Sequence, residues 1–513
     1  MPTESLIIKT GSKTWENRHI TFSQQIDDLY DMWNAGTGDA LADYNTMTVA
    51  IQNEIRLAIA DQKSLRALGG GWSWTRIATT PGRMLNTKGL NTVFTLSPAS
   101  VSTEYTGHPE DLLFAQCGNS IQELNAFLKK KLRALKTCGA SNGQTIVGAM
   151  STGTHGSAFD FGAIPDFIVG LHIVVGPARH VWLERKSYPV ASAMLVDKLH
   201  AELIQDDDLF NAALVSFGSF GFIHGVMLET ESIYLLECHR MRVPTNAALD
   251  KLMATLNFFH APLPHGNQKP FHFQALFNPY DLSGGAYINI MYKRSYHTNY
   301  ESPVNNSGGL SPGDDAPAFI GLLSQVLPGT TGFLVNQLVG ASYKLYANQL
   351  GTLGEIFTNT TTRGKVLSAA IGIALNQVVA VKELLLKLND IHCFAGVFAF
   401  RYVKATSATL GFTRFSPVTC VVELDGVFSD KTDSFFGAVW HALEQEQIPF
   451  TFHWGKICEL NPTRLKNMYG SRLTSWIAAR HKLLDHDSLP VFTNPQMEEW
   501  GLTWPVDAAP PKV

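Results

Sequence analysis

The sequence lacks the features that mark several common protein classes. Its 40 Lys and Arg residues are balanced by 44 Asp and Glu residues, which gives a net charge of −4. No basic field is therefore available to hold nucleic-acid phosphates, and we expect no nucleic-acid binding. The six cysteines show no Cys-x-x-Cys spacing, which argues against a disulfide framework and against a four-thiolate metal site. We expect reduced, mostly buried thiols.

We expect neither a targeting segment nor a membrane-spanning segment. The first residues show no cationic segment followed by an apolar run and a small-residue cleavage site. The most apolar long stretch, 366–381, contains Asn376 and Gln377 and is shorter than the roughly 20 residues that a bilayer span needs. We therefore expect a cytoplasmic protein with no transmembrane segment.

The residues that are present predict a large folded α+β protein. The chain has 513 residues, of which 45% are hydrophobic and 16% charged. A strand over 63–68 leads into three glycines, and Ser120 and Glu123 form a capping box at the start of a helix. Beyond about residue 232 aromatic residues alternate with period two, as in 271–277, which predicts a half-buried sheet. We place a domain boundary at this change.

One region, 316–388, is unusually apolar. We interpret it as buried helices packed on a sheet. The alternative is a hydrophobic lid over the substrate or a hydrophobic surface that binds a partner.

Two glycine-rich segments are candidates for anion binding, because backbone N–H groups without a neighbouring Cβ can approach an anion closely. The first, 69–74, lacks the Gly-Lys-Ser/Thr ending of a P-loop and the GxGxxG of a dinucleotide fold. Taken alone, it is also compatible with a simple tight turn. The second, 151–157, combines four hydroxyl groups with His155 and two glycines. A self-capping Ser/Thr loop is the structural alternative for this segment.

Four motifs follow one another along the chain. The first is 66–74, with the triple glycine, and the second is 143–149 running into 151–156. The third, 216–221, reads Ser-Phe-Gly-Ser-Phe-Gly, and the fourth, 453–456, reads His-Trp-Gly-Lys. In this order they resemble the motifs of the vanillyl-alcohol oxidase superfamily of FAD-linked oxidases, most closely its aldonolactone (gulonolactone) and alditol oxidase branch.

This resemblance implies a fold and its boundaries. Residues 1–232 would form a two-subdomain FAD-binding domain of the PCMH type. Residues 233–460 would form a substrate-binding cap domain, with a large antiparallel sheet flanked by helices and an apolar helical insert near 316–388. Residues 461–513 would return to the FAD domain.

The resemblance also implies which residues contact FAD. The pyrophosphate would lie against the first loop, at Gly69, Gly70, Gly71 and Ser73. The flavin would lie against the second loop, at Ser151, Thr152, Gly153, Thr154, His155 and Ser157. The adenine side would be formed by Ser216, Gly221 and Ile223. Trp72 stands where many relatives link a histidine covalently to the flavin, so we expect noncovalent FAD.

The alditol oxidase branch carries a Glu-x-Arg pair on a cap strand that faces the flavin. Here the segment 398–405 fits that strand, with Arg401 retained and Ala399 in place of the glutamate. Glu423 or Asp425 on the next strand could substitute, since alternation points both to one face. The missing carboxylate puts a simple polyol or aldonolactone substrate in doubt.

Three basic residues are the candidate catalytic groups. Lys456 is expected to stabilise reduced flavin or a nascent alkoxide, Arg401 to clamp the substrate, and His453 to orient it or act as a base. The structural alternatives are a hydrogen-bonded core histidine and an ion-paired arginine.

We expect an FAD-dependent oxidase or dehydrogenase. It would transfer a hydride from an alcohol-type C–H of a small molecule to flavin N5, with O2 or another acceptor reoxidising the flavin. The alternatives are a biosynthetic flavoprotein that oxidises an amine or closes a ring, and a flavin-binding protein without turnover. No metal site is expected, because the spacings of His260, His265 and His272 match no ligand pair and no carboxylate joins them.

Overall fold

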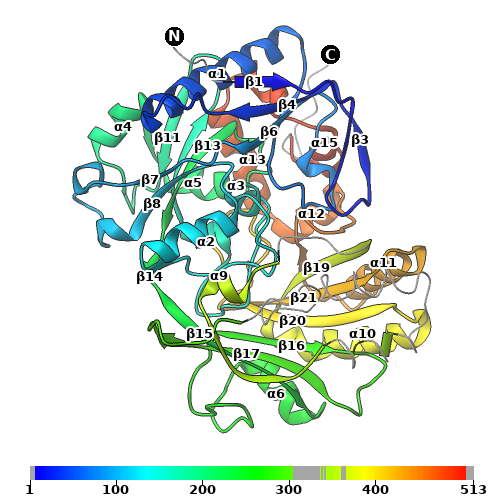
Figure 1. Cartoon of the computed structure of the whole chain (residues 1–513). Coiled ribbons are helices and arrows are strands. Elements are labelled where there is room, and N and C mark those ends of the chain that lie inside the picture. Colours follow the sequence, from blue (N-terminus) through cyan, green and yellow to red (C-terminus); the bar gives the residue numbers. More distant parts are fainter. Residues whose placement is uncertain (1–5, 304–334, 337–338, 340–342, 360–364, 504–513) are drawn as a thin grey trace.

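The computed structural model describes residues 6–303, 335–336, 339, 343–359 and 365–503. Two sheets and their helices form an N-terminal unit, drawn in blue to green in the upper part of Figure 1. An eight-stranded sheet, here called the cap sheet, lies below it in green and yellow. Orange and red helices from the C-terminal end of the chain lie with the N-terminal unit.

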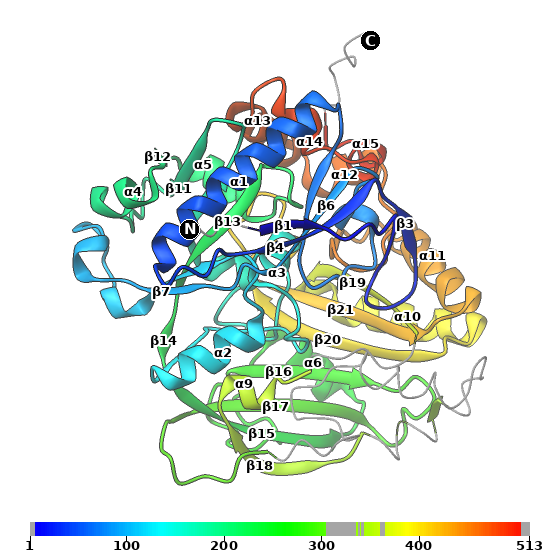
Figure 2. The ribbon, with the colours of Figure 1, turned by 45° about the horizontal axis from the view of Figure 1, so that its top comes forward.

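The first sheet of the N-terminal unit ends at the first glycine loop. Its order is β1 (Leu6–Lys9), β4 (Asp28–Trp33), β6 (Arg83–Gly89) and β5 (Leu65–Leu68). Helix α1 (Ala40–Ala60) is capped by Asp39, whose carboxylate accepts from the N–H groups of Leu41 and Ala42. Figure 2 shows α1 lying across the N-terminal unit. A hairpin of β2 (Thr14–Glu16) and β3 (Ser23–Gln25) stands beside this sheet.

The second sheet has six strands. Their order is β12 (Glu202–Gln205), β11 (His180–Glu184), β10 (Ile168–Val174), β13 (Phe222–Glu229), β8 (Leu112–Gln116) and β7 (Val93–Thr95). The helices of this part of the chain are α2 (Ile121–Lys130), α3 (Ile146–Ser151), α4 (Ala193–Leu199) and α5 (Asp207–Leu214). As predicted, Ser120 and Glu123 cap α2 reciprocally. Two short strands, β9 (Arg133–Ala134) and β14 (Glu231–Ser232), pair where the chain leaves this unit.

The cap sheet is antiparallel throughout its described pairs. Its order is β18 (Tyr346–Gly351), β15 (Tyr234–Val243), β17 (Ala286–Ser295), β16 (His272–Phe277), β20 (Gly396–Lys404), β21 (Val418–Val427), β19 (Val366–Ala374) and β22 (Phe450–Phe452). Three helices, α6 (Ala247–Thr255), α10 (Val378–His392) and α11 (Asp430–Gln445), pack beside one another on it. The short helix α9 (Leu353–Ile356) contacts α2 and β15.

The C-terminal segment packs against the N-terminal unit. It forms α12 (Pro462–Tyr469), α13 (Ser471–Leu483), α14 (Ser488–Val491) and α15 (Pro495–Trp500). Helix α13 contacts α5, α14 contacts α1, and α15 contacts the 3-10 helix η1 (Arg76–Ala78). Other 3-10 turns are η2 (Pro98–Ser100), η3 (Pro109–Asp111), η4 (Ile164–Phe167) and η5 (Leu375–Gln377). Among the described helices, none has the length and apolarity needed to cross a bilayer.

Two predictions from the sequence pattern need correction. The helical prediction for 316–388 is wrong over Tyr346–Gly351, which forms the edge strand β18, and over Val366–Ala374, which forms β19 between β21 and β22. A strand buried on both faces is a continuous apolar run, so its periodicity does not distinguish it from a buried helix. The prediction holds for α10, and 316–334 lies outside the described residues. The aromatic strand β16 is fully rather than half buried.

Candidate active site

A cavity lies between the two glycine-rich loops of the N-terminal unit and the cap sheet. The cofactor residues expected from the sequence that line it are Gly69, Gly70, Gly71, Trp72, Ser73, Ser151, Thr152, Thr154, His155, Gly221 and Ile223. The expected catalytic residues Arg401, His453 and Lys456 line the same cavity. Motifs that are almost 400 residues apart in the sequence therefore line one cavity.

Three of the expected cofactor residues are not part of the cavity wall. The hydroxyl of Ser157 donates to the carbonyl of Phe273 at 2.5 Å and accepts from the N–H of Tyr402 at 3.0 Å, which ties the second loop to β16 and β20. Ser216 shares a hydrogen bond of 3.2 Å with the hydroxyl of Ser151. Gly153 forms a turn with φ of +73° against Phe412. Their polar groups are used within the protein, so their place here is to hold the loops in position.

The first glycine loop packs against Thr145 and against the His-Trp-Gly-Lys turn. A Cβ on Gly69 would lie 2.1 Å from the hydroxyl of Thr145, so only glycine lets the two loops meet here. Gly71 has φ of +71°, a conformation that favours glycine. On the far side, the N–H of Trp74 donates to the carbonyl of Gly455 at 2.8 Å. The loop thereby also positions the His-Trp-Gly-Lys turn.

The hairpin segment between β2 and β3 closes over this loop. The N–H of Arg18 donates to the carbonyl of Gly71 at 2.8 Å, and a ring nitrogen of His19 lies 3.2 Å from the carbonyl of Trp72. The ring of His19 stacks on that of Trp74 with centroids 3.6 Å apart, and His19 itself lines the cavity. The sequence analysis missed this contribution, since no motif links His19 to a loop some fifty residues away.

A second missed residue, Arg66, gives the cavity a positive wall. Its guanidinium is 1% exposed and donates to the carbonyl of Phe217 at 2.8 Å. Among the described residues no carboxylate lies within ion-pair distance of it, and burial together with Arg480 lowers its pKa to about 9. A buried cation without an acidic partner favours an anion in the adjoining space. The glycine loops and Arg66 together therefore fit a cofactor that carries phosphate groups.

The cap-sheet side of the cavity carries a buried charge cluster centred on Glu423. Its carboxylate lies 3.4 Å from Nζ of Lys456, 3.5 Å from Nε of Arg401 and 3.7 Å from Nε2 of His155. Burial would raise the pKa of Glu423, but Arg401, Lys456 and His155 together lower it. The carboxylate is therefore ionised at neutral pH.

The two histidines of the cluster are neutral, and they carry their proton on different ring nitrogens. Burial, the largest influence, lowers the pKa of His155 to about 4 and that of His453 well below its usual value. Nδ1 of His155 lies 2.9 Å from the carbonyl of Gly156, so this nitrogen carries the proton and Nε2 is free to accept one. Nδ1 of His453 accepts from the N–H of Gly455 at 3.0 Å, so its Nε2 is a donor.

The strand register places a carboxylate opposite Ala399. Ala399 on β20 lies directly opposite Glu423 on β21, and both Glu423 and Arg401 line the cavity. The carboxylate thus comes from the neighbouring strand. Asp425, the other candidate, is not part of the cavity wall and accepts a hydrogen bond of 2.5 Å from Ser368. Of the two, Glu423 is the acidic group of the site.

Comparison with known proteins agrees with this geometry. Residues 46–184 match the model of an FAD-binding domain family. The chain is 27% identical over 186 residues to a putative D-arabinono-1,4-lactone oxidase of Neurospora crassa, which covers 36% of this chain and 28% of that protein. It is 27% identical over 207 residues to an L-gulono-1,4-lactone dehydrogenase of Mycobacterium tuberculosis, covering 40% and 41%. The matches thus span less than half of these relatives.

Solved structures share the fold over nearly the whole chain. Cholesterol oxidase from Brevibacterium sterolicum superposes with a TM-score of 0.66 at 12% identity, covering 98% of both chains. Xylooligosaccharide oxidase from Myceliophthora thermophila superposes with a TM-score of 0.61 at 12% identity, covering 96% of both chains. Residues 46–184 therefore belong to an FAD-binding domain family, and the whole chain shares the fold of these two oxidases.

Proposed function

We propose that this protein is an FAD-dependent oxidoreductase that removes a hydride from an alcohol-type C–H of a small polar molecule and passes it to flavin N5. Dioxygen, reduced to H2O2, is the proposed electron acceptor. The observation that carries the proposal is the cluster that Glu423, Arg401 and Lys456 form with His155 of the second glycine loop on the cavity wall. The names of the lactone-oxidising relatives support it.

The bound FAD supplies the acceptor for the hydride, and the side chains manage the oxygen and its proton. Glu423 accepts a hydrogen bond from a second hydroxyl of the substrate and so fixes the orientation of the substrate. His155 Nε2, an unprotonated nitrogen beside Glu423, takes the proton of the reacting hydroxyl. Lys456 and Arg401 stabilise the negative charge that develops on the oxygen. His453 donates a hydrogen bond from Nε2 and orients the substrate. Its Nδ1 already accepts a hydrogen bond from the N–H of Gly455, so His453 has no free nitrogen to act as a base.

The cluster favours a hydroxylated or lactone-type substrate over an amine. A substrate ammonium next to Glu423 would lie beside Arg401 and Lys456, whose like charges oppose it. The presence of Glu423 also removes the reason to doubt a polyol or lactone, since the acidic group missing at Ala399 is supplied from β21.

The proposal includes noncovalent FAD. Trp72 lines the cavity at the place where relatives carry a linked histidine, and its indole offers no nucleophilic nitrogen.

The test is anaerobic reduction of the purified yellow protein by separate sets of polyols, aldonolactones and amines. We expect the flavin bands to bleach with a polyol or lactone and to return, with formation of H2O2, when air is admitted. The Lys456→Ala variant should slow bleaching at least about tenfold. Bleaching by amines alone would contradict the substrate class. Bleaching by no substrate, with normal reduction by dithionite, would contradict the enzymatic function itself.

A further inference from the structure

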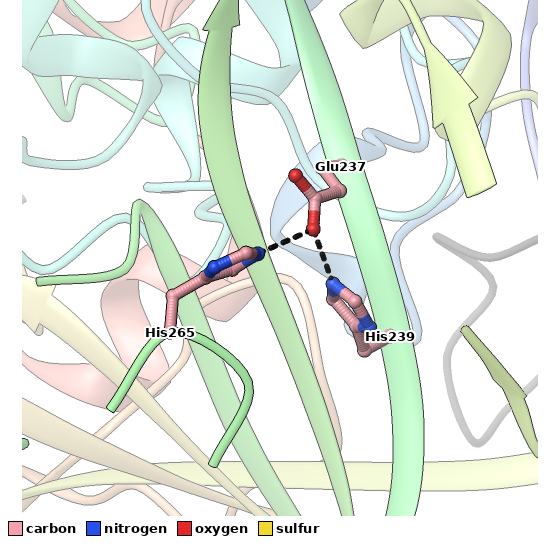
Figure 3. A group of neighbouring side chains, drawn as sticks. All are labelled: Glu237, His239 and His265. Atoms are coloured by element: carbon pink, nitrogen blue, oxygen red, sulfur yellow. Dashed lines mark hydrogen bonds and ion pairs between the residues drawn. The ribbon is translucent and has the colours of Figure 1, made fainter. Parts of the chain in front are cut away.

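A second group of chemically competent side chains lies on the cap sheet, away from the cavity (Figure 3). Glu237 and His239 stand two residues apart on β15, so they point to one face of the sheet, and His265 reaches them from the connection between α6 and β16. The three ligand atoms lie within 4.8 Å of one another.

The register separates this group from the active site. Arg240 pairs with Asn289, Asn289 with Gln274 and Gln274 with Arg401, so Arg240 shares the face of Arg401 that lines the cavity. Successive residues of a strand alternate between faces. Glu237 and His239 therefore point to the opposite face of the cap sheet.

The contacts converge on one oxygen atom. Nε2 of His239 and Nε2 of His265 each lie 2.7 Å from Oε1 of Glu237, as the dashed lines in Figure 3 show. Two imidazole nitrogens and a carboxylate oxygen are a preferred donor set for Zn²⁺ and related ions. Ligand atoms around a tetrahedral zinc ion lie roughly 3.4 Å apart, so each histidine nitrogen needs to move roughly 0.7 Å away from Oε1 of Glu237. His265 is 44% exposed, which leaves room for a water ligand and a path for the ion.

The surrounding residues hold this arrangement in place. Nε of Arg294 donates to the other oxygen of Glu237 at 2.6 Å, which leaves Oε1 directed at the histidines. Nη1 of Arg294 also donates to Gln268 at 3.0 Å, and the hydroxyl of Tyr292 donates to the carbonyl of Pro264, directly before His265. Supporting hydrogen bonds of this kind orient the ligands in metal sites.

Two features of the histidines bear on metal binding. His265 has φ of +55°, a left-handed conformation in which histidine is several-fold enriched and which often marks functional positions. One contact opposes metal binding: Nδ1 of His239 accepts a hydrogen bond from the N–H of Asn348 at 3.4 Å. A ring that binds an ion through Nε2 carries its proton on Nδ1, so this hydrogen bond is then lost. At 3.4 Å the contact is weak, so the tautomer can change at little cost.

We propose that Glu237, His239 and His265 bind one divalent transition-metal ion, best Zn²⁺, with water as the fourth ligand. The ion fastens the connection before β16 to β15 and so stiffens the outer end of the cap sheet. The site takes no part in the proposed oxidation.

The experiment is zinc titration of tag-free, EDTA-treated protein by isothermal calorimetry, with metal content measured by mass spectrometry after dialysis. We expect one zinc ion per chain and a rise in Tm on adding zinc. His265→Ala should weaken binding at least about tenfold and abolish the rise in Tm. His260→Ala is the matched control, because His260 lies in the same connection with φ of +60° and is not a member of the ligand group.

Equal zinc affinity of wild type and His265→Ala would overturn the proposal, as would a wild-type Kd weaker than about 100 µM. Since His265 is partly exposed, its truncation is not expected to unfold the chain, and circular dichroism melting of each variant checks this. Glu237→Gln gives a second, independent loss of a ligand charge and should weaken zinc binding in the same way.

Discussion

Replacement of Glu423 by glutamine tests the central feature of the active site. The change keeps the shape and one acceptor oxygen but removes the charge that lies 3.4 Å from Lys456 and 3.5 Å from Arg401. At an effective dielectric constant of 20, each contact is worth about 5 kcal/mol before the cost of desolvation. Removing one partner from such a buried group typically costs about 3–5 kcal/mol of stability. Losing one contact that positions the substrate costs roughly 10²-fold in rate.

Stopped-flow reduction of the flavin by its best substrate measures the catalytic part of this effect, and urea unfolding measures the stability part. We expect Glu423→Gln to slow reduction about 100-fold. Asp425→Asn is the comparison variant: it also removes a buried carboxylate from β21, one that lies 4.0 Å from Nζ of Lys456, but Asp425 is not part of the cavity wall. It should lose comparable stability and less than about fivefold in rate. Equal rate losses in the two variants, or an unchanged rate for Glu423→Gln, would refute the role given to Glu423.

Four further predictions concern the cofactor and the buried histidines. Arg66→Met should weaken FAD binding roughly 10–100-fold, measured by quenching of FAD fluorescence; an unchanged Kd would contradict the anion-binding wall. His19→Ala should speed FAD release by roughly 2–10-fold in the same assay, because the ring that stacks on Trp74 of the first glycine loop is lost. Acid precipitation should leave the flavin in the supernatant, and a yellow pellet would contradict the interpretation of Trp72. Burial lowers the pKa of His155 to about 4 and that of His224 to about 3. The unfolded chain therefore takes up protons below about pH 6.5 that the native chain does not, and stability falls between pH 7.5 and 5.5 by up to roughly 1.4 kcal/mol per pH unit for each histidine. A urea midpoint that does not change between pH 7.5 and 5.5 would contradict this pH dependence.

The sequence alone predicted those features that depend on neighbouring residues. The capping box at Ser120 and the strand before Gly69 appear in the structure where local pattern placed them. The strand that carries Arg401 appears where the family resemblance placed it. The order of the motifs resembled that of FAD-linked oxidases, and the match of residues 46–184 to an FAD-binding domain family confirms the cofactor prediction. Local pattern failed at β19, where burial on both faces hides the strand period.

Only the tertiary structure decided which distant groups meet. Strand register sets Glu423 opposite Ala399, and sequence spacing does not specify register between separate strands. His19 reaches the first glycine loop through a hairpin contact that carries no motif. Glu237 joins His265 across a connection, although the histidine spacings gave no sign of a carboxylate partner. Each depends on side chains brought together by packing of elements far apart in the chain, and packing is a property of the whole fold.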